Sequence, residues 1–345
     1  MALSTIQNNS LADTAVHGYR NLLTNSAMQV AQRGSSASIP ANTVTYAADR
    51  WFAYYSSTDE LAGTIAQDAD APDGFALSTK ITTTTAETTI AADEYASFTQ
   101  RMEGLDLQGL GFGTSAAQNL TLSFWVKSSI TGTFAINMYQ PDGSYVIGST
   151  YTINSANTWE YKTITLDGNT LGSIVNDSTE GLRVTFTLAA GSDWTSTDNT
   201  SWGSYANGKW SYGQTQNGLI TTLNATWQIT GVQLEVGSEA TPFEHRSYGD
   251  ELARCQRYYY QVDNGTQNGK FYAAQYTASY KMFHFPFPTT MRATPTSTLP
   301  ISSGALTEWN PTKDSVLAYI TSNTSDTGTY HVPSSGNSAK FDAEL

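Results

Sequence analysis

The chain is poor in charge and has a single cysteine. Of its 345 residues, 17 are Lys or Arg and 30 are Asp or Glu, which gives a net charge of −13. The basic residues are dispersed, so no basic stripe is available to neutralise phosphates, and we do not expect nucleic-acid binding. Cys255 alone cannot form an internal disulfide, which fits assembly in a reducing cytoplasm.

Long apolar runs and clustered metal ligands are missing as well. No run approaches the roughly 20 apolar residues that cross a bilayer, and no charged stretch followed by an apolar one opens the sequence. We therefore expect no membrane insertion and no export signal. The four histidines include no pair at metal-ligand spacing, which argues against zinc. We expect no cofactor. Structural calcium at a turn such as Asp167-Gly168 remains an alternative, but no ligands are assigned because no D-x-D-x-D-G loop is present.

Threonine is abundant: its 50 copies outnumber all charged residues together, beside 20 Tyr and 27 Gly. This composition is typical of β-strands joined by polar turns. The length predicts two domains. We predict a mainly β protein with a polar N-terminal attachment arm at 1–20 and a jelly-roll or β-sandwich domain at 21–246. One short linking helix and a smaller C-terminal β domain follow at 247–345.

Alternating apolar and polar residues support the sandwich. In 120–127 and again in 182–188, every second residue is apolar, which predicts half-buried strands. The sequence PDGS at 141–144 predicts a hairpin turn. Within 226–237 the alternation changes phase around Gly231, which predicts a glycine β-bulge.

The segment SYGDELARCQRYY at 247–259 departs from this pattern. Leu252, Cys255 and Tyr259 would share one face of a helix, with acids early and arginines late, so we predict a short helix here. On that apolar face, Cys255 is expected to be a buried small hydrophobe and not a nucleophile.

Several long segments resemble those of bacteriophage virion proteins, especially fibre-like proteins of marine and freshwater phages. The resemblance covers nearly the whole chain and is carried by residues 21–34, 49–51, 98–134, 229–259, 285–296 and 342–345. It implies a non-enzymatic tail-fibre-type structural protein with a carbohydrate-binding-module-like jelly roll. Such a protein would assemble in the host cytoplasm, join other virion proteins through the arm at 1–20, and reside in the virion. The resemblance, together with the excess of aromatic β surface, implies a homotrimer.

An aromatic loop at 191–218 is the candidate binding site. It is rich in Gly, Ser and Asn and contains Trp194, Trp202, Tyr205, Trp210 and Tyr212. Aromatic faces stack on sugar rings while nearby amides take the hydroxyls, so the loop could hold a host surface glycan. The alternative, which residue statistics favour, is packing against the sandwich or a neighbouring subunit, since aromatics are also enriched at interfaces.

Catalytic residues are not evident. A glycosidase holds two carboxylates about 5–10 Å apart. The candidate acids are dispersed along the chain: Asp93, Glu94, Asp142, Asp193 and Asp198. None of their pairings stands out, so we expect them at solvated loop positions and expect no enzymatic activity. A strand, and not a helix, follows the glycines of 109–113, which predicts a turn cluster and no phosphate loop.

The aromatic residues at 258–260 and 283–288 are predicted to pack the base of the C-terminal domain, with a glycan platform as the alternative.

Two functions therefore compete. The first is a tail-fibre adhesin whose loop at 191–218 contacts host glycan, and the second is a capsid decoration or head-appendage protein attached to the shell, without glycan binding. A free loop would favour the first. Polysaccharide hydrolysis is a weaker third option.

Overall fold

The computed structural model describes residues 20–56, 61–215, 217–262, 270–271, 274–277, 280–299, 307–321, 330–331 and 338–345. Residues 1–19 of the predicted attachment arm lie outside the described residues. The chain divides into two compact units, Met1–Ser247 with Leu345 and Tyr248–Glu344, here called the N-terminal unit and the C-terminal unit.

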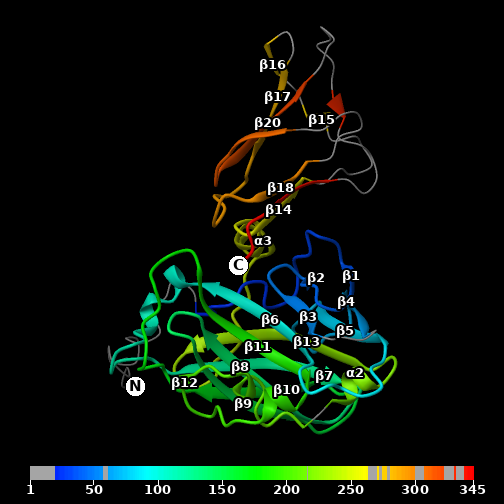
Figure 1. The fold of residues 1–345 in the computed structure, drawn as a ribbon, viewed down its shortest axis with the longest axis vertical. Helices are drawn as coiled ribbons and strands as arrows, with labels where there is room; N and C mark the ends of the chain where they lie inside the picture. The colour runs from blue at the N-terminus through cyan, green and yellow to red at the C-terminus, as the bar shows by residue number, and fades with distance from the viewer. Residues whose placement is uncertain are drawn as a thin grey trace, which may run out of the picture. The chain divides into compact units, whose positions relative to one another are not determined.

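The N-terminal unit is a sandwich of two antiparallel sheets (Figure 1). The six-stranded sheet has the order β1 (Ser36–Ile39), β4 (Ala62–Asp68), β5 (Ser78–Thr85), β13 (Thr226–Val236), β7 (Leu120–Ser128), β10 (Glu160–Leu166). The seven-stranded sheet has the order β12 (Gly203–Ser204), β9 (Tyr145–Ile153), β8 (Gly132–Gln140), β11 (Glu180–Ala190), β6 (Tyr95–Glu103), β3 (Phe52–Ser56), β2 (Thr45–Tyr46). The predicted fold class, mainly β with a sandwich, is confirmed.

Short helical turns connect these strands: η2 (Gly104–Asp106), η3 (Gln108–Leu110), α1 (Ser192–Thr195), η4 (Asn207–Lys209) and α2 (Gly218–Thr221). The glycines predicted as a turn cluster are confirmed as such. Gly111 ends η3 in the left-handed conformation, Gly113 has a φ of +82°, and strand β7 follows.

The core of this unit lies between the two sheets. The predicted inward residues of β7 and β11 are fully or almost fully buried: Leu120, Leu122, Phe124, Val126, Leu182, Val184, Phe186 and Leu188. Trp51 stacks on Phe98 with 5.1 Å between ring centroids. Burying one large apolar side chain contributes about 1.5–3 kcal/mol, so this layer is the main source of the unit's stability.

Two local predictions are also confirmed. Gly231 has a φ of +61°, and the pairing of β13 with β7 shifts register between Thr230 and Gln233, as expected of a glycine bulge. The segment 141–144 turns β8 into β9, closed by a 2.9 Å hydrogen bond from the Ser144 N–H to the Pro141 carbonyl.

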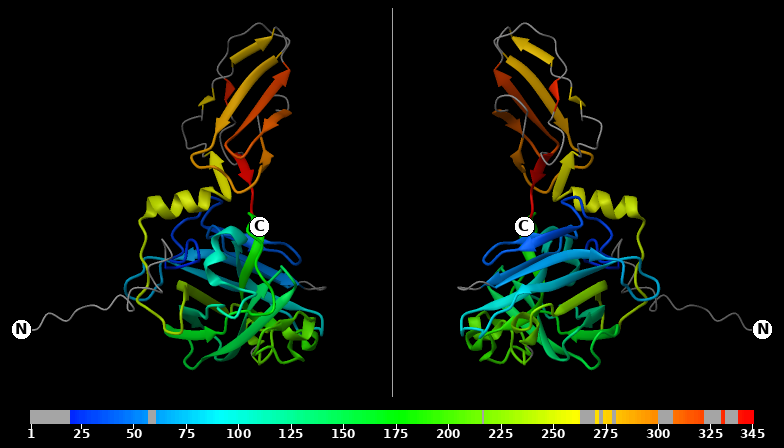
Figure 2. Two further views of the ribbon diagram at one scale, coloured as in Figure 1. Left: turned by 90° about the vertical axis from the view of Figure 1, so that its left-hand side faces the viewer. Right: turned by 90° about the vertical axis from the view of Figure 1, so that its right-hand side faces the viewer.

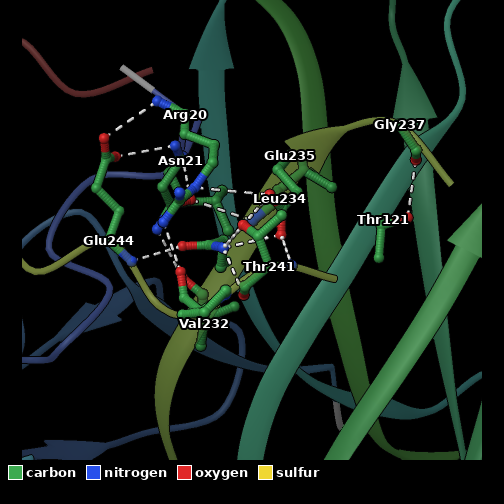
Figure 3. Close-up of polar contacts among 12 residues, drawn as sticks. Arg20, Asn21, Thr121, Val232, Leu234, Glu235, Gly237, Thr241 and Glu244 are labelled. Atoms are coloured by element: carbon green, nitrogen blue, oxygen red, sulfur yellow. Dashed lines mark hydrogen bonds and ion pairs between the residues drawn. The ribbon is translucent and has the colours of Figure 1, made fainter. Parts of the chain in front are cut away.

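Polar contacts fix residues 20–21 beside β13 (Figure 3). The buried Asn21 side chain donates to the Val232 carbonyl at 3.0 Å and accepts from the Leu234 N–H at 3.1 Å. The Glu244 carboxylate accepts from the main-chain N–H groups of Arg20 at 3.2 Å and Asn21 at 3.0 Å. Together with the Leu22 N–H, which donates to the Leu234 carbonyl at 2.9 Å, these bonds tie the start of the described chain to the C-terminal half of β13.

The C-terminal unit begins with α3 (Tyr248–Gln256), the predicted short helix (Figure 2). Its described strands form three sheets. The first contains β14 (Tyr259–Val262), β22 (Ala339–Asp342) and β18 (Thr296–Thr298), and the second contains β15 (Lys270–Phe271) and β21 (Tyr330–His331). The third contains β16 (Ala274–Thr277), β17 (Tyr280–Pro286), β20 (Ser315–Thr321) and β19 (Thr307–Pro311). Within the described part of the chain, no helix has the length and apolar character needed to span a membrane.

The helix ends earlier than predicted. Cys255 is buried as expected, but Tyr259 belongs to β14, so its predicted place on the helical face was wrong. The chain turns at Tyr258, whose N–H donates to the Cys255 carbonyl at 2.9 Å. The aromatic residues pack: Tyr258 and Tyr259 are buried, and Phe283 and Phe285 lie in this unit's core, which favours the packing interpretation over a glycan platform.

Candidate functional site

The outer face of the seven-stranded sheet carries polar and aromatic side chains. Because residues alternate between the faces of a strand, the inward Ala96 and Phe98 of β6 leave Tyr95, Ser97 and Thr99 pointing outward. The strand register then places three long side chains in one row across three strands: Arg101 of β6, Arg183 of β11 and Tyr139 of β8.

The predicted aromatic loop crosses part of this face and is anchored to it by hydrogen bonds. The Asn137 side chain of β8 donates to the Trp210 carbonyl at 2.7 Å, and the Thr187 and Ser211 hydroxyls lie 2.9 Å apart. The Gly148 N–H of β9 donates to the Asn199 carbonyl at 2.8 Å. These contacts hold the loop over β8, β9 and β11, and its aromatics Trp194 and Trp210 lie beside residues of β6 and β3.

Two adjoining hollows lie where the loop meets the sheet. The first, of about 250 Å³, is lined by Tyr95, Tyr139, Arg183, Trp194, Tyr205 and Trp210. The second, of about 130 Å³, is lined by Val44, Phe52, Tyr54, Tyr95, Ser97, Thr99, Arg101, Arg183 and Trp210. They share Tyr95, Arg183 and Trp210, so we treat them as one aromatic groove.

Ring contacts between loop and strands shape this groove. Trp194 of α1 lies against Tyr95 of β6, with 4.6 Å between centroids and 60° between planes. Tyr205 contacts Tyr139 of β8 at 5.5 Å and Trp210 at 5.8 Å, both edge to face. Such pairs add roughly 0.5–1.5 kcal/mol beyond their buried area, which holds the rings in defined orientations.

Two guanidinium groups and one carboxylate set the charge of the groove. Glu180 accepts from the Arg183 Nε and, at 2.9 Å, from its Nη2, and it lies 3.5 Å from the Arg101 Nε. The guanidinium carbon of Arg183 lies 5.0 Å from the Tyr139 ring centroid and 5.9 Å from that of Trp210. The groove is thus a cationic, aromatic surface on an acidic protein.

The tyrosine hydroxyls of the groove are neutral, and that of Tyr205 already donates to the Asn207 side-chain oxygen at 2.9 Å. Burial raises the pKa of Tyr95 to about 12, and burial also raises the pKa of Tyr205 above its ordinary value. Both hydroxyls therefore remain protonated at neutral pH. The indole N–H groups of Trp194 and Trp210 are buried and have no hydrogen-bond partner among the described residues.

Three of the five predicted loop residues line the groove: Trp194, Tyr205 and Trp210. Trp202 instead packs edge to face on Phe112 at 5.7 Å, and its indole N–H donates to the Asp167 carbonyl at 2.6 Å. Tyr212 is 36% exposed and lies outside the lining of both hollows. Within this loop, three aromatic residues therefore line the groove, Trp202 anchors the loop by packing, and Tyr212 is exposed.

The strand residues of the groove were not predicted from the sequence, chiefly Tyr54, Tyr95, Tyr139 and Arg183. The available signal was their position opposite the core-facing residues in an alternating strand. Alternation predicts that a residue lies on the outer face of its strand, but it does not predict which outer residues of different strands are neighbours.

Three of the candidate acids accept hydrogen bonds from loop residues. The Glu94 carboxylate accepts from the Ala91 N–H at 2.9 Å, and Asp142 accepts from the Val175 N–H at 2.9 Å. Asp198 accepts from the N–H and the hydroxyl of Thr200, both at 2.8 Å, and the hydrogen bonds lower its pKa. The described residues contain no group of three or more His, Cys, Asp and Glu that could hold a metal ion.

Comparisons with known proteins are limited to fold. No protein-family model and no curated protein matches the sequence. The fold is similar to the enzymatically active domain of tailspike protein 4 of bacteriophage CBA120, at 13% identity and a TM-score of 0.34 over 64% of this chain and 22% of that chain.

Carbohydrate-binding modules are further neighbours. The family 11 module from Clostridium thermocellum, in complex with a mixed-linked tetrasaccharide, shows 11% identity and a TM-score of 0.29 over 60% of this chain and 99% of that chain. The xylan-binding domain from Paenibacillus barcinonensis Xyn10C shows 13% identity and a TM-score of 0.27 over 61% and 100%.

Proposed function

We propose that the N-terminal unit binds a glycan chain in the aromatic groove, as the host-contacting part of a phage virion protein of the tail-fibre type. The observation that carries the proposal is the meeting of Trp194, Tyr205 and Trp210 from the loop with Tyr95 and Tyr139 from the sheet around one open groove.

The chemistry of the groove suits sugars. Aromatic rings cover the apolar C–H face of a pyranose, while phenol hydroxyls, threonine hydroxyls and guanidinium N–H groups bond its hydroxyls. Trp194 and Tyr205 are half-buried, so parts of both rings face solvent in the groove. An aromatic loop wholly used for packing would leave no such surface.

The length of the groove suits a chain more than a single sugar. Its lining comes from β3, β6, β11 and β8, which are consecutive neighbours in the sheet. Three inter-strand steps of about 4.8 Å each give roughly 14 Å, the length of a few sugar residues.

The decisive experiment measures retention of the purified protein on immobilised polysaccharides from a host cell surface, for the wild type and for Trp194→Ala. Binding by the wild type and its loss in the variant would support the proposal. Equal retention of both would remove the groove as the site. Release of reducing ends during incubation would contradict a non-enzymatic role.

A second role, contact with other virion proteins as in a shell decoration, is favoured by a feature of the C-terminal unit. An apolar hollow of about 220 Å³ is lined there by Tyr280, Met282, Trp309 and Tyr319, and 52% of Trp309 is exposed. A hollow with an exposed tryptophan at its side offers an apolar surface for a protein contact. Under this role, Trp309→Ala would reduce incorporation into particles and leave glycan binding unchanged.

We also propose that the protein resides in the virion as a homotrimer. The motif resemblance supports both statements. Light scattering of the purified protein at micromolar concentration tests the trimer, which a monomer mass would exclude. Imaging of virions with an antibody to this protein tests the location, and labelling at the capsid would favour the decoration role.

A further inference from the structure

Arg183 has hydrogen-bonding capacity that the protein does not use. A guanidinium group carries five N–H donors. Glu180 takes the Nε donor and one Nη2 donor, and no other described residue bonds this side chain. Three donors of Arg183 therefore remain, on a residue that lines both hollows of the groove.

The surroundings of Arg183 orient these donors. The bond to Glu180 fixes one edge of the guanidinium, and the Tyr139 ring lies 5.0 Å from its central carbon. A planar guanidinium held in this way matches a planar carboxylate through two parallel N–H···O bonds, which a hydroxyl group cannot provide.

The charge balance also calls for an anion. Arg101 lies directly opposite Arg183 in the strand pairing, and the single Glu180 carboxylate contacts both. Arg101 also donates to the main-chain oxygen of Leu345, whereas among the described residues only Glu180 accepts from Arg183. A carboxylate supplied by a ligand would bond the remaining donors of Arg183.

We propose that the aromatic groove selects an acidic glycan, with the carboxylate of a uronic acid residue bound by Arg183 while the aromatic rings cover the neighbouring sugars. This inference rests on the proposed glycan binding and adds the class of sugar. Glu180 is a positioning residue, because it acts through the guanidinium group.

The test uses the full chain and paired probes that differ in whether their carboxylates are free or methyl-esterified. Oligogalacturonates, alginate and hyaluronan are compared with the same polymers after methyl esterification of their carboxylates, by affinity electrophoresis or calorimetry. The variants are Arg183→Gln and, as a matched control, Lys80→Gln. Lys80 belongs to β5 of the other sheet and pairs with Asp68 at 3.0 Å. Lys80→Gln therefore removes one positive charge outside the groove.

We expect at least one acidic polymer to bind tenfold or more tightly than its ester, Arg183→Gln to abolish that difference, and Lys80→Gln to preserve it. Equal binding of acid and ester forms, or stronger binding of a sulfated polymer than of every carboxylated one, would overturn the inference and leave glycan binding standing. Failure of every acidic and neutral polymer to bind would overturn the proposed function itself. Thermal unfolding of Arg183→Gln confirms that the variant is folded.

Discussion

Trp194 and Tyr95 are in ring contact, with 4.6 Å between their centroids, although one comes from a loop and the other from the first residue of strand β6. The contact joins the part of the aromatic groove formed by the loop to the part formed by the sheet. It adds to the hydrogen bonds of Asn137 and Thr187 that anchor the loop to the sheet.

Replacing Trp194 with alanine is expected to weaken glycan binding roughly tenfold, because truncation of a central aromatic contact commonly costs more than 1 kcal/mol of binding free energy. Calorimetry with the host polysaccharide measures the effect. Tyr212→Ala is the matched control, since this aromatic belongs to the same loop but lies outside the groove. Equal losses in both variants would contradict the assignment.

Replacing Trp202 with alanine should affect stability and not binding. This side chain packs on Phe112 and donates to the Asp167 carbonyl, and both contacts would be lost. We expect the free energy of unfolding to fall by about 2 kcal/mol, in line with loss of a partly buried aromatic side chain. Urea denaturation measures it. A variant of unchanged stability that fails to bind glycan would show that Trp202 belongs to the site.

Gly231→Ala should destabilise the N-terminal unit by about 2 kcal/mol or more. The residue has a φ of +61°, and an added Cβ would lie 2.5 Å from the Phe75 ring. The left-handed conformation alone costs about 1–2 kcal/mol for an alanine. Gly74→Ala separates the two effects, since Gly74 also has a positive φ but open space around its Cβ position. Equal destabilisation by both changes would rule out the clash.

Asn21→Ala is expected to lower the free energy of unfolding by about 3 kcal/mol. The buried Asn21 side chain bonds three main-chain groups, those of Val232, Leu23 and Leu234, and burial leaves them without water. Asn119→Ala, at a half-buried position with two weaker hydrogen bonds, serves as the control in thermal unfolding. A larger loss of stability in Asn119→Ala than in Asn21→Ala would contradict the contribution assigned to the Asn21 hydrogen bonds.

The acid sensitivity of the N-terminal unit should depend on Glu160. Burial by itself would raise the pKa of this carboxyl, but hydrogen bonds from Lys162, Ser155 and Asn154 outweigh it and lower the pKa to about 2. Because the folded pKa lies below the ordinary value of 4.5, the stabilisation is complete above pH 4.5 and is lost as the pH falls towards 2.

Glu160→Gln should therefore flatten the fall in melting temperature between pH 4.5 and 2, measured by circular dichroism. Asp177→Asn is a control at an exposed turn, where hydrogen bonds from Thr179 also lower the pKa. An unchanged pH profile in Glu160→Gln would contradict the assigned role.

Local patterns in the sequence predicted much of the sandwich. Strand β7 was visible because Leu122 and Phe124 alternate with polar residues, and the bulge was visible because the alternation changes phase at Gly231. Helix α3 was visible from its composition, but its end was not, since the start of β14 at Tyr259 depends on pairing with the distant β22.

The candidate site was predictable only in part, for the same physical reason. Aromatic residues concentrated in one polar loop are a property of the sequence, and they pointed to Trp194, Tyr205 and Trp210. Whether a given ring lines a groove or anchors the loop depends on which surface it meets. Trp202 and Trp210 are chemically alike, yet one packs on Phe112 and the other lines the groove.

The sequence by itself determined the secondary structure class, the acidic charge and the inward faces of the main strands, because these follow from composition and from a period of two residues. The tertiary structure alone decided that Arg183, Arg101 and Tyr139 form one row and that the loop aromatics lie beside it. Cross-strand register is set by the packing of the whole core, and it is this register that brings outward residues of separate strands together around one groove.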